Sequence, residues 1–384
     1  MKFCKRLVAV CLLIAFLLPF SVLAEGPKVA ASSAILVDYD SGRILYEQNP
    51  HEKRLIASIT KLMTALVAVE SHPDLTQEVE VKPEWTGAEG SSLYLKAGEV
   101  WRLETLLYGL LLHSGNDAAI AIAGFCAGDE TRFVSWMNRR AQDLGMTSTR
   151  FQNPNGLNHE EHYSTAADMA KLAAACLRNE AVARIVATKS IAVEGRTFQN
   201  HNKLLWQYEG CVGMKTGYTQ MAGRTLVSAA RRDGQTLIVV TLNDPDDWKD
   251  HKTLYDYGFT AYPKHCFYEA GQTLTLLPVE GSLLRSVAVN VMDEVSYPFT
   301  EEEVEEAEIT VSLPKTVKAP VQEGAIAGEV SLSLNGKILS KSYLLYGASI
   351  RRDAVVDNEG IRHLLELFRN KEKNTFLQEV LEGE

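Results

Sequence analysis

Residues 55–64 read LIASITKLMT, a mostly apolar run that carries Ser58 and Lys61 as its polar pair. The apolar residues predict a buried helix, and residues three apart on a helix share a face, so the hydroxyl and the amine are expected within hydrogen-bond reach. Burial lowers the pKa of a lysine because the ammonium loses its hydration, which would make Lys61 a base near neutral pH. A serine beside such an amine can act as a nucleophile.

The spacing alone does not establish catalysis. The chain contains a second Ser-x-x-Lys, Ser312 to Lys315, where Pro314 excludes a helix. Two further motifs follow Ser58 in order. HSGNDAA places Ser114 and Asn116 between two apolar runs, where a helix N-cap is the plainer interpretation.

MKTGYT holds the third motif, which lies just before the strand-like run TLVSAA. Lys215, Thr216 and Gly217 form the only Lys-Thr-Gly in the sequence. A plain strand start is the alternative. It leaves Gly217 unexplained, because glycine weakens a strand unless something approaches its backbone closely.

The hydropathy pattern predicts a strand–helices–strands order over residues 25–270. AILVDYDSGRILYEQN predicts a hairpin around residues 40–42, and Asp233-Gly234 predicts the turn of a second one. Helical patterns lie between them at 101–126, 132–145 and 164–179, and NPNGL (153–157) is expected to form a loop. This order is typical of an antiparallel sheet that carries helices.

Beyond residue 270 the helical pattern stops. Short strand-like runs with Gly and Pro between them predict a second, all-β domain over residues 271–350. The acidic run EEEVEEAE (301–308) is expected to be a solvated loop or strand edge.

Both ends of the chain carry targeting features. Residues 1–24 combine three cations, an apolar run and a small-residue ending, which predicts a signal peptide cleaved after Ala24, and hence export. Residues 351–384 form a tail with an amphipathic helical pattern from residue 360. That helix either packs on protein or makes peripheral contact with a membrane, and the tail's net charge of −2 does not favour anionic lipid.

Charge and cysteine content exclude several classes. The 384-residue chain has a net charge of −10, and the mature chain would be near −13, which disfavours nucleic acid as a partner. Four scattered cysteines outside the signal are not a disulfide framework. No cluster has metal-ligand spacing, so neither a metal nor another cofactor is expected.

Together, Ser-x-x-Lys, Ser-x-Asn and Lys-Thr-Gly in this order resemble the motifs of the penicillin-recognising serine peptidases. HSGNDAAIAIA, FQNPNGL, HYSTAADMAKLA, NHNKLLW and LYDYGF are similar to stretches of the D-alanyl-D-alanine carboxypeptidases, the low-molecular-mass penicillin-binding proteins. The resemblance runs from about Ser33 to Leu345. It implies an α/β (α+β) catalytic domain like that of penicillin-binding proteins and β-lactamases, followed by their β-rich C-terminal domain.

The resemblance also implies roles for the motif residues. Ser58 would be the acylated nucleophile, Lys61 its proton acceptor, and Ser114 the relay that protonates the departing amine. The substrate would be a peptidoglycan stem peptide ending in D-Ala-D-Ala, and β-lactam antibiotics would act as inhibitors. The protein would work at the outer face of the cytoplasmic membrane, in the cell wall or in the periplasm.

Substrate binding would fall to the remaining motif residues. Asn116 would hold the substrate backbone, Lys215 and Thr216 its terminal carboxylate, and Gly217 would let the peptide lie along the strand. The oxyanion would be bound by the backbone N–H groups of Ser58 and Tyr218.

One position departs from the family pattern. Many relatives carry an arginine, which helps to bind the substrate carboxylate, where this chain has Asp247. Carboxylate recognition would then depend more on Lys215 and Thr216, or on another cation such as Arg224. Two other functions stay open: a β-lactamase on the same fold, and a catalytically silent wall-binding protein. The sequence lacks the Glu-x-x-Leu-Asn element of class A β-lactamases between Ser114 and Lys215.

Overall fold

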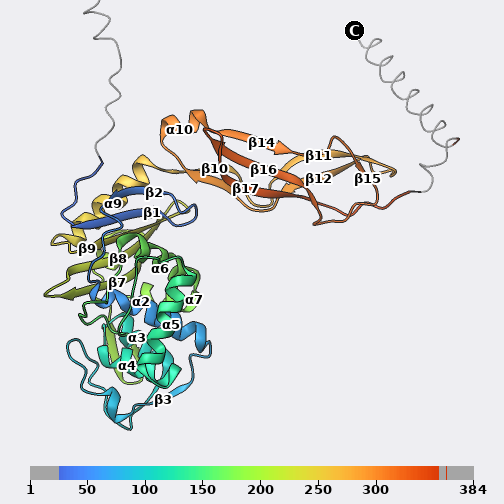
Figure 1. The fold of residues 1–384 in the computed structure, drawn as a ribbon. Coiled ribbons are helices and arrows are strands. Elements are labelled where there is room, and N and C mark those ends of the chain that lie inside the picture. The colour runs from blue at the N-terminus through green and yellow to red at the C-terminus, as the bar shows by residue number, and fades with distance from the viewer. Residues whose placement is uncertain (1–25, 354–359, 361–384) are drawn as a thin grey trace, which may run out of the picture.

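The computed structural model describes residues 26–353 and residue 360. The predicted signal peptide and the predicted helix of the tail lie outside the described residues, apart from Gly360. Figure 1 shows two parts, a first domain of helices around a sheet and an elongated β domain. The β domain extends away from the edge of the first domain that holds β1 (Ser33–Asp38) and β2 (Ile44–Gln48).

A five-stranded antiparallel sheet forms the middle of the first domain, in the order β2-β1-β9-β8-β7. Both predicted hairpins are confirmed, since β1 pairs with β2 and the Asp233-Gly234 turn joins β8 to β9. The strands are β1 (Ser33–Asp38), β2 (Ile44–Gln48), β7 (Cys211–Thr219), β8 (Gly223–Arg232) and β9 (Gln235–Leu242).

Helices cover both faces of this sheet. Strand β9 is buried along its whole length, and its side chains alternate between two cores. Leu237 and Val239 pack with α9, whereas Ile238 and Val240 join the large core of the other helices. These helices are η1 (Ala57–Thr60), α2 (Lys61–Ser71), α3 (Leu103–Leu111), α4 (Asn116–Ala127), α5 (Glu130–Asp143), α6 (Ala166–Arg178), α7 (Glu180–Ala187), α8 (Leu204–Gln207) and α9 (Asp247–Ala261).

Short elements complete the first domain. Two two-stranded sheets and a 3₁₀ turn lie outside the main sheet: β3 (Glu78–Glu80), η2 (Pro83–Trp85), β4 (Val100–Arg102), β5 (Ser190–Val193) and β6 (Arg196–Gln199). The expected helical run 101–126 is interrupted at Leu112–Gly115, and Ser114 there has a positive φ of 66°. This break places Ser114 between α3 and α4.

The second domain is a six-stranded sheet with its own core of aliphatic residues, in the order β14-β16-β17-β12-β11-β15. Strand β10 pairs with β13 of this second domain. The strands of the second domain therefore begin at Lys264, shortly after the end of α9 at Ala261 and before the predicted start at residue 271. The strands are β10 (Lys264–Tyr268), β11 (Thr273–Glu280), β12 (Ser286–Val291), β13 (Val295–Pro298), β14 (Glu308–Ser312), β15 (Val317–Lys318), β16 (Ile326–Leu334) and β17 (Lys337–Tyr346).

The prediction of a solvated loop or strand edge at 301–308 was wrong for residues 301–306, whereas Glu308 does begin the edge strand β14. Residues Glu301–Glu306 form helix α10, because Thr300 and Glu303 make a capping box at its start. Acidic side chains in the first turn also stabilise a helix N-terminus through the helix dipole. Glu303 is not merely solvated, since it forms two hydrogen bonds of 2.7 and 2.8 Å with Arg43 of the first domain.

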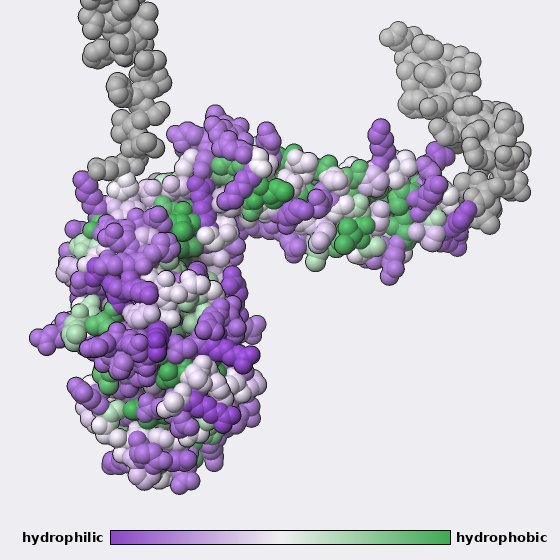
Figure 2. Space-filling view, in the orientation of Figure 1, coloured by the Kyte–Doolittle hydropathy of each residue, from purple (hydrophilic) through white to green (hydrophobic). Residues whose placement is uncertain are grey.

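Hydrophilic side chains dominate the face of the first domain in Figure 2. Among the described residues, no helix has the length and apolar character to cross a membrane, and no group of His, Cys, Asp or Glu could hold a metal ion. The four cysteines of this part are free thiols.

Candidate active site

Ser58 and Lys61 lie side by side, as the sequence predicted, although they sit on different kinds of helix. Ser58 is in the 3₁₀ turn η1 and Lys61 is the first residue of α2. The distance from Lys61 Nζ to Ser58 Oγ is 2.8 Å. Ala57, directly before the serine, has a positive φ of 48°, a strained conformation for a residue with a side chain. Such strain is common where a nucleophile must be presented to a pocket.

Lys61 is fully buried and has three hydrogen-bond acceptors. Besides Ser58 Oγ, its amine lies 2.7 Å from Asn116 Oδ1 and 2.5 Å from the carbonyl oxygen of Asn155. Burial, together with the nearby charge of Lys215, holds the pKa of Lys61 well below its ordinary value. A neutral amine can accept the hydroxyl proton of Ser58, so the geometry suits a serine–lysine nucleophile.

The loop NPNGL supplies a contact that the sequence did not reveal. The carbonyl oxygens of Pro154 and Asn155 accept hydrogen bonds from Thr64 and Lys61, both on α2. Gly156 has a φ of 87°, and a Cβ there would collide with the carbonyl oxygen of Ala57. The loop therefore packs against the nucleophile turn. The dipeptides Asn-Pro and Asn-Gly predict a turn, but no sequence signal indicates which carbonyl oxygen contacts the lysine.

Asn116 makes contacts within the protein. It is the first residue of α4, and its side chain connects Lys61, through Oδ1, to the carbonyl oxygen of Glu89, which lies 2.6 Å from Nδ2. The N-cap of α4 is Gly115, so the plain capping interpretation of Ser114 is not what the structure has. Ser114 instead lines the same pocket as Ser58.

The Lys-Thr-Gly segment lies on β7, at the edge of the main sheet, directly beside the nucleophile turn. A Cβ on Gly217 would lie 2.5 Å from Thr225 Oγ1 and 2.9 Å from the backbone nitrogen of Ser58. The expected close approach to Gly217 is thus present, and the approaching groups belong to the protein itself. Because Gly217 has no side chain, the backbone of β7 at Tyr218 can approach the backbone at Ser58 closely.

Lys215 and Thr216 point to different surroundings. Lys215 is buried, and its amine donates a hydrogen bond of 2.8 Å to the carbonyl oxygen of Thr216. Burial lowers the pKa of Lys215 to about 7. The side chain of Thr216 faces the pocket.

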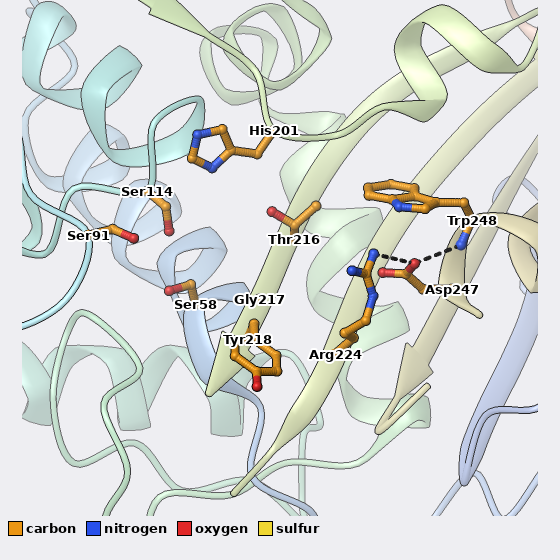
Figure 3. Close-up of a pocket in the computed structure, with 10 residues that line it drawn as sticks. All are labelled: Ser58, Ser91, Ser114, His201, Thr216, Gly217, Tyr218, Arg224, Asp247 and Trp248. Atoms are coloured by element: carbon orange, nitrogen blue, oxygen red, sulfur yellow. Dashed lines mark hydrogen bonds and ion pairs between the residues drawn. The ribbon is translucent and has the colours of Figure 1, made fainter. Parts of the chain in front are cut away.

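A cavity of about 280 Å³ brings most of these residues together (Figure 3). Its wall is formed by residues from η1, the α3–α4 break, β7, β8 and the start of α9, and by two residues from the loops before β4 and α8: Ser58, Ser91, Ser114, His201, Thr216, Gly217, Tyr218, Arg224, Asp247 and Trp248. Sequence reasoning did not find Ser91, His201 or Trp248, because single serines, histidines and tryptophans carry no motif. Burial lowers the pKa of His201 to about 4, so its imidazole is neutral near pH 7.

A strand-edge pocket with a serine–lysine pair, a second serine and a Lys-Thr-Gly strand defines an active-site serine enzyme of the penicillin-recognising class. Residues 21–246 match the family model of D-alanyl-D-alanine carboxypeptidases, and residues 262–352 match the model of the C-terminal domain of penicillin-binding protein 5. The chain therefore belongs to the D-alanyl-D-alanine carboxypeptidase family.

Individual relatives agree along most of the chain. D-alanyl-D-alanine carboxypeptidase DacF of Bacillus subtilis is 30% identical, covering 88% of this chain and 92% of its own. DacC of Escherichia coli is 32% identical, covering 84% of each chain. The crystal structure of penicillin-binding protein 5 from Haemophilus influenzae superposes with a TM-score of 0.68 at 28% identity, covering 85% of this chain and 99% of its own.

These matches settle the class of activity. The protein is a hydrolase that acts as a serine-type D-Ala-D-Ala carboxypeptidase. They give no support to the β-lactamase or to the silent wall-binding protein. Family membership also implies a peptidoglycan substrate and binding of β-lactams, and relatives act on the cell wall.

Proposed function

We propose that this protein removes the terminal D-alanine of peptidoglycan stem peptides through an acyl-enzyme on Ser58. Ser58 Oγ attacks the carbonyl carbon of the penultimate D-alanine while Lys61 accepts the hydroxyl proton. The tetrahedral intermediate collapses, the C–N bond breaks, and Ser114 gives its proton to the departing amine of the last D-alanine while it takes up the proton that Lys61 had accepted. Water then hydrolyses the ester and restores the serine.

The observation that carries this proposal is the 2.8 Å contact between Ser58 Oγ and a buried amine of lowered pKa. The backbone N–H groups of Ser58 and Tyr218 bind the oxyanion, and the close approach of β7 to η1 supports this pairing. Lys215 and Thr216 bind the substrate carboxylate. Asn116, already bonded to Lys61, would hold the substrate backbone.

Release of D-alanine tests the proposal. Wild-type protein with a stem pentapeptide ending in D-Ala-D-Ala should release one D-alanine per peptide and leave a tetrapeptide. Ser58→Ala should reduce release to background while its melting temperature stays close to wild type. D-alanine release at the wild-type rate by Ser58→Ala would overturn the assignment of the nucleophile.

We further propose that the chain is exported, with cleavage after Ala24. Amino-terminal sequencing of the mature protein tests this claim, with Glu25 as the expected first residue.

We also propose that the tail makes peripheral contact with the membrane. Truncation after Asp357 should then move the protein from the membrane fraction to the soluble fraction. Retention in the membrane fraction would contradict the anchoring role of the tail.

A further inference from the structure

Arg224 stands in the wall of the catalytic pocket next to the Lys-Thr-Gly strand. It lies on β8, and its cross-strand partner on β7 is Tyr218. Cross-strand partners project from the same face of a sheet, so Arg224 and Tyr218 point to the same side. Figure 3 shows the guanidinium between the strand and the Asp247–Trp248 segment. In the same view the guanidinium lies on the far side of Thr216 from Ser58.

Asp247 holds the guanidinium in place. Its Oδ1 lies 2.6 Å from Arg224 Nη2 and also accepts the backbone N–H of Trp248 at 2.8 Å. The Asp247 side chain is 3% exposed, whereas that of Arg224 is 41% exposed. The centre of the guanidinium lies 5.5 Å from the ring of Trp248. One edge of the guanidinium is thus fixed by the protein, and the exposed remainder faces the pocket.

The charges of the pocket make Arg224 distinctive. The pKa of Lys215 is lowered to about 7, so its positive charge is incomplete at neutral pH. The amine of Lys61 already contacts three acceptors of the protein, so it is not free to bind a carboxylate. His201 is neutral because burial lowers its pKa to about 4. Among the described residues that line the cavity, Arg224 is the one permanent cation.

The negative charge behind Arg224 explains why this arginine does not simply extend into solvent. Asp244, Asp247 and Asp250 lie close together, and burial with the nearby charge of Asp250 raises the pKa of Asp244 to about 7. Burial also raises the pKa of Asp247, and Arg224 opposes that rise. The guanidinium is therefore attracted toward the base of α9, at the rim of the pocket, and its orientation is set before substrate binds.

We propose that Arg224, oriented by Asp247, binds the free carboxylate at the end of the substrate together with Lys215 and Thr216. This inference rests on the proposed function. A guanidinium offers two parallel N–H donors that match a carboxylate, so it favours a chain that ends at this point. The consequence is selection for a free terminal D-alanine over a peptide whose last carboxylate is amidated or extended.

The experiment compares two substrates within each variant. One is the diacylated tripeptide ending in L-Lys-D-Ala-D-Ala with a free carboxylate, and the other is its C-terminal amide. Arg224→Gln should lower kcat/KM for the acid roughly 10- to 100-fold, the usual range for loss of one charge-assisted contact, and leave the amide nearly unchanged. Arg224→Lys should retain part of the preference. The acid-to-amide ratio does not depend on how much of a variant is correctly folded.

Arg232→Gln is the matched control. Arg232 lies at the far end of the same strand, is 40% exposed and also pairs with a carboxylate, that of Asp256 at 3.9 Å, but it does not line the pocket. Its acid-to-amide ratio should equal that of wild type. An equal loss on both substrates in Arg224→Gln, or no loss on either, would overturn the inference. Failure of wild-type protein to release D-alanine from the acid would instead overturn the proposed function.

Discussion

At the scale of single residues, the site depends on close approach between backbone segments. The three motifs were readable from sequence because each needs particular side chains at fixed spacing. The carbonyl oxygen of the NPNGL loop that contacts Lys61 could not be predicted from sequence. Every residue has a backbone carbonyl oxygen, so this contact does not require a particular side chain. The contacts of Asn116 with Lys61 and Glu89 likewise depend on tertiary structure.

Gly217→Ala tests this close approach. The added methyl group would lie 2.9 Å from the Ser58 nitrogen and 2.5 Å from Thr225 Oγ1, so β7 and η1 must separate. We expect acylation by benzylpenicillin to slow by roughly a hundredfold, the typical cost of one displaced oxyanion donor. Gly26→Ala, where a Cβ would meet nothing nearer than 3.4 Å, should acylate at the wild-type rate. Equal rates in the two variants would contradict the model of the oxyanion site.

The pH dependence separates the two buried lysines. Lys61 must be unprotonated to accept a proton, so activity should rise with pH through its lowered pKa. Lys215 is charged below its pKa of about 7, so in free enzyme the attraction for a carboxylate weakens as pH rises above that value. We expect kcat/KM for the free-carboxylate tripeptide to fall on the alkaline side, and the amide to lack this fall. Identical profiles for both substrates would exclude this role of Lys215.

At the scale of elements, local patterns predicted hairpins and long helices well, and failed where a cap or a break decides. Residues 301–306 of the acidic run form a helix because Thr300 and Glu303 cap each other. The sequence carries this capping signature, but the run of like charges favoured the prediction of a solvated loop. The sequence placed Ser114 between two apolar runs, but its positive φ of 66° is a backbone feature that apolar periodicity cannot reveal. In this conformation Ser114 lies between α3 and α4 and lines the pocket.

The NPNGL loop is the element whose support of the nucleophile can be tested alone. Gly156→Ala imposes both a strained φ and a collision with Ala57, whereas Gly145→Ala imposes a similar φ of 69° with open space around the new methyl group. Both variants should lose about 1 kcal/mol or more of stability from backbone strain. Only Gly156→Ala should also lose most penicillin labelling at a temperature where it is folded. Equal labelling by both variants would show that the loop does not position Lys61.

At the scale of the whole molecule, Arg43 makes several contacts across the junction between the two domains. Arg43, just before β2, donates to the carboxylate of Glu303 and to the carbonyl oxygen of Pro298, and its guanidinium lies over the rings of Tyr262 and Tyr297. The sequence indicated two domains through a change in periodicity. It could not indicate this contact, because the two ends of the ion pair are far apart in the chain.

Arg43→Ala should therefore weaken the junction without touching the pocket. We expect a loss of about 1–2 kcal/mol in the free energy of unfolding, since this pair is partly shielded and bidentate. Lys341→Ala removes an exposed pair with Glu329, which water screens, so it should lower the free energy of unfolding much less than Arg43→Ala does. Denaturant unfolding gives both values. Similar losses in the two variants would mean that the Arg43 contacts add nothing to an ordinary surface pair.

The central claim, that Ser58 is the nucleophile and Lys61 its base, is tested most directly by peptide mapping of the protein after reaction with benzylpenicillin. We predict one adduct per chain, on the peptide that contains Ser58, and no adduct in Lys61→Met although that variant keeps a cooperative thermal transition. An adduct on any other residue, or labelling of Lys61→Met at the wild-type rate, would contradict the account.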